Sequence, residues 1–379
     1  MIPKKMRFLS KFTAVAMHKP VTIIIFIVLI SLLGVLEVAA QSTGKEGSYV
    51  IKNFMFKSGE TLEELRINYG TWGEPKRDNT GKITNAVLLC HGTNGRWQMF
   101  GAPFWASNMY GPGQPLDITK YYVIASDTIG CGKSSKPSDG LRMKFPKYIT
   151  EDVVKAQYIL LTDGLNVNHL VAVAGYSFGG RQAWQWGIQY PDFVTGIIPM
   201  ASSPFPNAGR RGMQDFLPIE AIIKDPSWKN GDYSEQPNNL EISWMYGVLF
   251  GYGAVHLWEV APTREKSFEY LPELFKKAGR DADANNSIYQ WRVNDGFEAY
   301  SQLDKIKARV LVINLVGDPM VPIELNHIEK AMEKLGEKGK YLLVKESSKF
   351  GHLALLYTMN IIGAKIGEFL KKIEAISGK

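Results

Sequence analysis

Cysteine and histidine are scarce in this sequence, which contains two of the former and six of the latter among 379 residues. Two cysteines, Cys90 and Cys131, are too few for a disulfide framework, although one bond between them is an open alternative if the protein is exported. Because the histidines are scattered and the cysteines are isolated, no group has the spacing of a metal site. We therefore expect no metal and no other cofactor.

Positive charge outside the N-terminus is also limited. The chain has a net charge of +7, but residues 1–40 carry +4 of it, from five basic residues and the acid Glu37, which leaves +3 for the remainder. So small an excess gives no reason to expect a nucleic acid partner. The sequence also lacks low-complexity tracts and repeats at solenoid periods, which excludes a solenoid and a mainly disordered chain.

Residues 1–40 combine a basic start with an apolar run from Val21 to about Val35 and the small residues Ala39 and Ala40. This order is typical of a secretory signal peptide. Since the run is near the length that spans a bilayer, an uncleaved anchor in the inner membrane is the alternative. We predict an exported protein, periplasmic or secreted, that meets a membrane only if this segment is retained.

Short, continuous apolar runs recur along the remaining chain, and such runs are typical of strands that are covered on both faces. They lie at 86–92, 121–127, 169–175, 308–318 and 340–346, with helical patterns at 150–161, 178–189, 324–334 and 353–373. Residues 49–72 alternate instead, which predicts two further strands joined by a turn. The pattern as a whole predicts an α/β fold, with a mostly parallel central sheet and helices on both faces.

One segment breaks this alternation. Between residues 204 and 296 no buried strand pattern appears, and helical patterns, loops and aromatic residues fill the interval. An insert of that length between two core strands predicts a helical cap over one edge of the sheet. The core then comprises residues 41–203 and 297–379.

A single serine stands between glycines in the segment Gly175-Tyr176-Ser177-Phe178-Gly179. The segment follows a buried strand pattern and opens a helical pattern, which is the arrangement of a nucleophile elbow. The serine would lie at a helix N-terminus, where N–H groups face developing negative charge. The pattern therefore predicts Ser177 as a nucleophile, and an ordinary tight turn is the alternative.

A serine hydroxyl reacts only when a base takes its proton. His352 follows the last predicted strand and precedes the last helix, which places it at the same sheet edge as Ser177. Asp318 ends the preceding strand, and the order serine, acid, histidine is that of hydrolases. We predict a triad of Ser177, Asp318 and His352, with an oxyanion hole made by the N–H groups of Thr93 and Phe178.

Several stretches together resemble the homoserine O-acetyltransferase branch of the α/β-hydrolase superfamily. The resemblance runs from about residue 59 to the C-terminus and is carried by residues 89–93, 127–135, 145–146, 149–157, 175–186, 190–192, 225–228 and 231–233. It implies the α/β-hydrolase fold and the triad already given.

The chain departs from this family at two charged positions. Family acetyltransferases typically follow the catalytic histidine with an aspartate near the homoserine amine, where this chain has Leu353, and carry an arginine where it has Ile219. Losing both removes groups that would pair with a zwitterion. Arg181, Arg210 and Arg211 are candidates to bind substrate in their place, although a solvated face or a cap salt bridge would also explain them.

These departures, with the export signal, set the expected reaction. An exported protein is not expected to meet acetyl-CoA but does meet water, so we predict a serine hydrolase that cleaves a small-molecule carboxylic ester through an acyl-enzyme on Ser177. The alternative is an O-acyltransferase of the homoserine O-acetyltransferase type with an alcohol acceptor. A binding or sensor protein with negligible turnover is a third class, which a complete triad disfavours.

Overall fold

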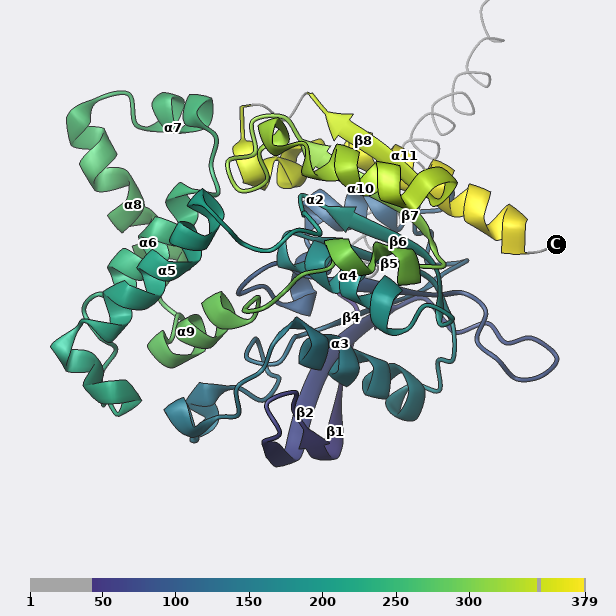
Figure 1. The fold of residues 1–379 in the computed structure, drawn as a ribbon, viewed down its shortest axis with the longest axis horizontal. Coiled ribbons are helices and arrows are strands. Elements are labelled where there is room, and N and C mark those ends of the chain that lie inside the picture. The colour runs from purple at the N-terminus through teal and green to yellow at the C-terminus, as the bar shows by residue number, and fades with distance from the viewer. Residues whose placement is uncertain (1–42, 346–348, 378–379) are drawn as a thin grey trace, which may run out of the picture.

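The computed structural model describes residues 43–345 and 349–377 of the chain (Figure 1). The segment expected to be a signal peptide or anchor lies outside these residues. Within them, an eight-stranded sheet has the order β1-β2-β4-β3-β5-β6-β7-β8. The strands are β1 (Lys45–Met55), β2 (Thr61–Trp72), β3 (Ala86–Cys90), β4 (Tyr122–Ser126), β5 (Leu170–Tyr176), β6 (Val194–Met200), β7 (Arg309–Leu315) and β8 (Gly339–Val344).

The sheet is mostly parallel, as the continuous apolar runs predict. β1 pairs with β2 and β2 with β4 in antiparallel register, whereas every pair from β4 to β8 is parallel. Strands β3, β4 and β5 are buried along their whole length, which is why their sequences lack polar alternation.

Strand β6 is absent from the sequence prediction. Its segment contains Gly196 and Pro199, two residues that weaken a strand pattern. In the structure, a Cβ atom at Gly196 would lie 2.7 Å from Cδ1 of Ile373, so glycine here lets the last helix pack against the strand. The close packing of helix and strand thus requires a glycine, and this glycine weakens the strand pattern in the sequence.

Helices cover both faces of the sheet and confirm the predicted α/β class. They are α2 (Pro103–Met109), α3 (Thr150–Ile159), α4 (Phe178–Gln189), α5 (Arg210–Ile223), α6 (Leu240–Leu249), α7 (Ala254–Val260), α8 (Arg264–Ala278), α9 (Ala284–Arg292), α10 (His327–Leu335) and α11 (Leu355–Ser377). One apolar core joins the sheet to α2 and α11, and another joins its opposite face to α3, α4 and α10. A window within Gly351–Ala375 is long and apolar enough to cross a membrane, but half of it is buried, as expected for a core helix.

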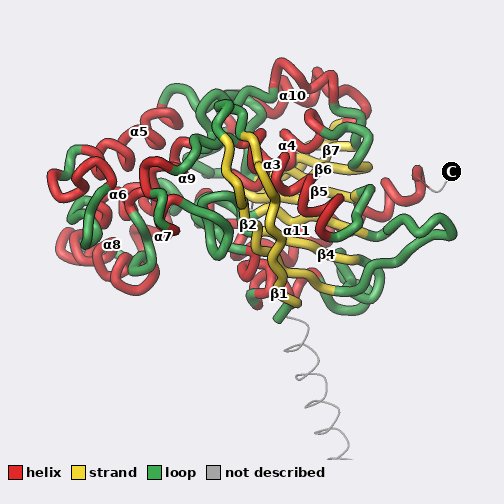
Figure 2. The backbone as a smooth tube through the Cα atoms, turned by 90° about the horizontal axis from the view of Figure 1, so that it is seen from below, coloured by secondary structure: helices red, strands yellow, loops and turns green. Residues whose placement is uncertain are grey.

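Helices α5 to α9 follow β6 and precede β7, and no strand lies among them. Figures 1 and 2 place these helices together to one side of the layered core. We call residues 204–296 the cap. The cap has its own small apolar core, which includes Ile219, Ile222 and Trp228.

Candidate active site

Ser177 occupies a strained turn between β5 and α4. Its φ of 58° and ψ of −118° lie in a region that non-glycine residues rarely adopt. A Cβ atom at Gly175 would lie 2.0 Å from the carbonyl oxygen of Gly179, and one at Gly179 would lie 1.9 Å from that of Cys90. Both glycines are therefore required by close backbone approach, and the turn has the form of a nucleophile elbow.

The three residues predicted as a triad lie in hydrogen-bond contact. Nε2 of His352 is 2.8 Å from Oγ of Ser177, and Nδ1 of His352 is 2.7 Å from Oδ2 of Asp318. The other carboxylate oxygen, Oδ1 of Asp318, accepts the N–H groups of Met320 and Val321 at 2.8 and 3.1 Å. Asp318 and His352 are only 3% and 4% exposed, so the pair is shielded from bulk water.

Three parallel strands explain why these distant residues meet. Ser177 directly follows β5, Asp318 follows β7, and His352 lies between β8 and α11. The carboxyl ends of parallel strands share one edge of a sheet, which is where α/β proteins place their sites.

Tyr176 fixes the backbone of His352, a role that the sequence did not predict. Its hydroxyl donates a hydrogen bond to the backbone carbonyl of His352, and the two rings lie 5.2 Å apart. Burial raises the pKa of Tyr176 well above its usual value, which keeps the hydroxyl a neutral donor. The only sequence signal was its place inside the elbow motif, beside the nucleophile.

The predicted oxyanion donors lie beside the nucleophile. Helix α4 begins at Phe178, so the N–H of that residue belongs to the first turn, where N–H groups have no acceptor within the helix. Thr93 lines a cavity together with Ser177, and a Cβ atom at the preceding Gly92 would lie 3.5 Å from Cβ of Ser177. Thr93 and Phe178 both line this cavity beside Ser177, and their role as oxyanion donors stays a prediction.

His91 fixes the loop that carries Thr93. Its ring is fully buried, with Nδ1 donating to the carbonyl oxygen of Gly92 at 2.7 Å and Nε2 accepting the N–H of Thr128 at 3.1 Å. Burial lowers the pKa of His91, because an imidazolium would be desolvated and could not accept the Thr128 hydrogen bond. This histidine therefore has a structural role in its neutral form.

The buried neutral ring predicts a specific loss of stability in acid. Since the pKa of His91 is lower in the folded than in the unfolded chain, its contribution is complete above the unfolded value and is lost as the pH falls below it. Between pH 7 and 5 we expect this residue to account for up to about 2 kcal/mol of the free energy of unfolding. Urea denaturation at both pH values would show the loss in the wild type and a smaller one in His91→Gln. Equal losses in both proteins would contradict this assignment.

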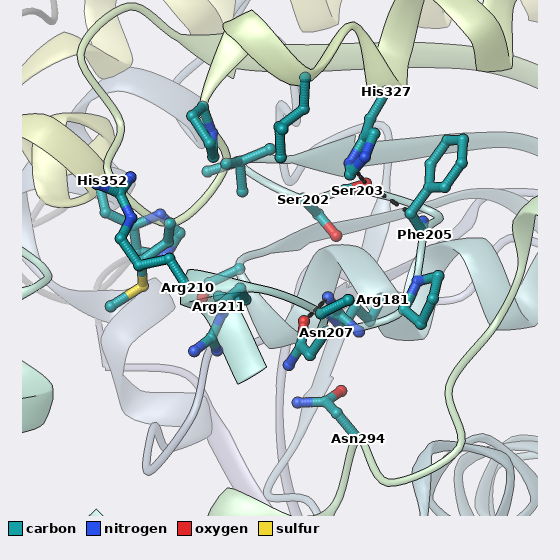
Figure 3. Close-up of a pocket in the computed structure, with 18 of the residues that line it drawn as sticks. Arg181, Ser202, Ser203, Phe205, Asn207, Arg210, Arg211, Asn294, His327 and His352 are labelled. Atoms are coloured by element: carbon teal, nitrogen blue, oxygen red, sulfur yellow. Dashed lines mark hydrogen bonds between the residues drawn. The ribbon is translucent and has the colours of Figure 1, made fainter. Parts of the chain in front are cut away.

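Two cavities meet at Ser177. The first, which we call the arginine pocket, has a volume of about 440 Å³, and its lining includes Arg181, Ser202, Asn207, Arg210 and Arg211 (Figure 3). The second, which we call the tryptophan pocket, has a volume of about 240 Å³ and is lined by Trp244, Val248, Trp291 and Leu353 among others. Ser177 and His352 line both, so a group bound in either cavity can reach the triad.

The structure separates the three arginines named as candidate substrate anchors. Arg211 forms a salt bridge of 2.6 Å with Asp215 within α5, and Nη2 of Arg210 donates to the carbonyl oxygen of Pro319 at 2.7 Å. Arg181 is only 7% exposed and has no carboxylate partner among the described residues. All three line the arginine pocket.

The two departures from the family lie in different places. Leu353 lines the tryptophan pocket beside His352, whereas Ile219 is buried in the apolar core of the cap and does not line either cavity at Ser177. Within residues 43–345 and 349–377, no group of three or more His, Cys, Asp or Glu residues could hold a metal ion. Cys90 and Cys131 are both buried and free, so the alternative of a bond between them is not realised here.

Comparisons of the sequence and of the structure with known proteins point to the same family. A family model described as alpha/beta hydrolase fold matches residues 85–357. A homoserine O-acetyltransferase of Nautilia profundicola is 31% identical over 367 residues, covering 84% of this chain and 96% of the relative. The crystal structure of homoserine O-acetyltransferase from Bacillus anthracis has a TM-score of 0.76 at 25% identity and covers 86% of this chain and 97% of its own. The structure of esterase E22, with a TM-score of 0.74 at 21% identity over 87% of this chain and 99% of its own, shows the fold alone.

These findings confirm the resemblance seen in the sequence and correct the expected reaction. The prediction of an ester hydrolase is wrong, because relatives that match most of the chain are named as acetyltransferases. The expected export of the protein stays a prediction. A triad of this kind activates water and alcohols alike, so the loss of charged residues at Leu353 and Ile219 gives no reason to expect hydrolysis.

Proposed function

This chain belongs to the alpha/beta hydrolase fold family and is an enzyme of that superfamily, and from this premise we propose that it is an O-acyltransferase. It moves an acyl group from an activated ester or thioester to the hydroxyl of an alcohol, through an acyl-enzyme on Ser177. The observation that carries this proposal is similarity to an enzyme named homoserine O-acetyltransferase over 84% of the chain.

In the first half-reaction, His352 acts as base. Its Nε2 takes the proton of the Ser177 hydroxyl while Oγ attacks the donor carbonyl, and Asp318 stabilises the imidazolium that forms. The N–H groups of Thr93 and Phe178 stabilise the oxyanion. The bond from the acyl carbon to the leaving group then breaks, the proton passes from His352 to that group, and an ester on Ser177 remains.

In the second half-reaction, the acceptor replaces the leaving group. His352 takes the proton of the acceptor hydroxyl, the new oxygen attacks the acyl carbon, and the Ser177 oxygen leaves with the proton. Water competes for the same intermediate. The meeting of two cavities at Ser177 favours the alcohol, because one can hold a bound acceptor while the other holds the acyl group.

Transfer and hydrolysis are told apart by the products. With p-nitrophenyl acetate as donor and a panel of short hydroxy compounds that includes homoserine, we expect at least one acceptor to give acetyl ester in about tenfold excess over free acetate. Mass spectrometry of the products measures this ratio. Free acetate as the sole product with every acceptor, while Ser177 still becomes acetylated, would overturn the proposal.

A further inference from the structure

One buried cation at the site has no carboxylate partner among the described residues. Arg181 lies in α4 four residues after Ser177 and is 7% exposed. Its Nη2 donates to Oδ1 of Asn207, and its guanidinium stacks over the ring of Phe297 with 4.6 Å from Cζ to the centroid. Its Nη1 is buried and has no hydrogen-bond partner among the described residues. A buried donor of this kind indicates a ligand that supplies the missing acceptor.

The neighbouring charges do not neutralise Arg181. The carboxylate of Asp215 receives Arg211 on Oδ1 and the side-chain amide of Asn207 on Oδ2, so both of its oxygens have partners. Of the two guanidinium groups, only that of Arg211 is bonded to this carboxylate. Burial, and then the charge of Arg211, lower the pKa of Arg181 to about 9, and the charge of Asp215 opposes this shift only in part.

A second unpaired donor faces the same cavity. Ser202 is 2% exposed, and its hydroxyl has no hydrogen-bond partner among the described residues. Ser202 and Arg181 both line the arginine pocket, where Figure 3 shows them with Asn207 and Asn294 around one hollow. The one acidic residue in that lining, Glu324, is exposed. The pocket therefore presents donors and positive charge to whatever enters it.

Helix geometry sets the reach of this site. Residues four apart in an α-helix lie about 6 Å apart along its axis, on nearly the same face. Arg181 is thus about one helical turn from Ser177, and both residues line the arginine pocket. A chain of a few atoms can therefore join an anion at Arg181 to a carbonyl or hydroxyl at Ser177.

We propose that Arg181 binds a carboxylate of the substrate, with Ser202 as a second donor, so that this enzyme acts on short molecules that carry a carboxylate a few atoms from the reacting group. This inference rests on the proposed function in taking Ser177 as the acyl site. The carboxylate belongs either to the acyl group, as in a dicarboxylic half-ester, or to the acceptor, as in a hydroxy acid. Arg181 is not at the place of the family arginine, which Ile219 occupies, so the anchor is a separate one.

Two arms of one experiment distinguish these sources. In the donor arm, kcat/KM is measured for p-nitrophenyl hemisuccinate and for the neutral p-nitrophenyl butyrate. In the acceptor arm, 4-hydroxybutanoate and 4-hydroxybutanamide compete for the acetyl-enzyme formed from p-nitrophenyl acetate. We expect a preference for the charged compound in one arm, and a fall of that preference by about 10- to 100-fold in Arg181→Met.

Two further variants calibrate this result. Arg181→Lys keeps the charge but loses the planar fork, so it should keep part of the preference. Arg292→Met removes a cation that lines an adjacent cavity and not the arginine pocket. This variant should therefore keep the full preference for the charged compound. An equal fall in Arg292→Met would mean that only the general field matters, and would overturn the assignment to Arg181.

A binding measurement separates this inference from the proposed function. Calorimetric titration of Ser177→Ala with succinate and 4-hydroxybutanoate should detect at least one of them, with a dissociation constant about tenfold or more higher when Arg181→Met is added. Hydrolysis without transfer, together with a charge preference, would reject the acyltransferase and keep the carboxylate site. Transfer with no charge preference in either arm, and no binding, would reject the site and keep the acyltransferase. If Arg181→Met does not fold, competitive inhibition of the wild type by succinate, but not by succinamide, decides the same question.

Discussion

Replacement of Ser177 by alanine should lower the rate of acyl transfer by about 10⁴- to 10⁶-fold and abolish the acyl-enzyme. The hydroxyl is the atom that His352 activates at 2.8 Å, and no other hydroxyl is hydrogen-bonded to that ring nitrogen among the described residues. The residual rate would come from the oxyanion donors and from substrate binding alone. Mass spectrometry of the protein after a short reaction with p-nitrophenyl acetate should show one acetyl group on the wild type and none on Ser177→Ala.

The matched control is Ser267→Ala, which removes an exposed hydroxyl of α8 that bonds only the backbone carbonyls of Ala261 and Thr263. It should keep both the rate and the acetyl group. Ser177→Gly should be as inactive as Ser177→Ala but more stable by about 1 kcal/mol, because glycine relieves the positive φ of 58°. Acetylation of Ser177→Ala at the wild-type rate would place the nucleophile elsewhere.

The triad could be proposed from sequence because each of its members follows a strand with a clear apolar pattern. β5, β7 and β8 are apolar runs, and the order of the residues that follow them matches one known arrangement. The hydrogen bond that holds the backbone of His352 in place could not be predicted in the same way. The bond from Tyr176 to the backbone of His352 depends on how the loop after β8 folds back over the elbow.

The three arginines of the site show most clearly what the sequence alone does not predict. In the sequence, Arg181, Arg210 and Arg211 are three equivalent cations near an active-site motif. The salt bridge from Arg211 to Asp215 joins residues four apart in α5, which is a spacing that a sequence pattern can reveal. The surroundings of Arg181 depend instead on tertiary packing, because its partner Asn207 lies in the cap while Arg181 lies in α4 of the core.

Packing also explains why the expected reaction differs from that of the relatives. Leu353 and Ile219 replace charged residues of the family, but they lie in different surroundings, one in the tryptophan pocket and one in the cap core. From the sequence alone, their replacement predicts the loss of an acceptor site. The structure offers a different donor set in the arginine pocket, which Ser177 also lines. Binding groups can move within a fold while the triad and its chemistry stay in place.

Replacement of Asp318 by asparagine should lower kcat by about 10⁴-fold with little change in fold. The N–H groups of Met320 and Val321 both point at Oδ1, so they should hold the amide oxygen of the new side chain there. Its NH₂ group would then take the place of Oδ2 and donate to Nδ1 of His352. That bond fixes the proton of the imidazole on Nε2, and such a ring cannot accept the proton of Ser177.

The comparison that isolates this effect is Asp225→Asn in the cap. Asp225 is also buried and also accepts backbone N–H groups, from Ser227 and Asn239, but it does not touch the triad. It should lose stability and keep most of its kcat, whereas Asp318→Asn should lose kcat and keep most of its stability, as measured by steady-state kinetics and urea denaturation on both variants. Full activity in Asp318→Asn would mean that His352 is oriented by Tyr176 and packing alone. Two N–H donors fixed on one oxygen make that outcome unexpected, because they leave the asparagine a single orientation, and it is the one that blocks the base.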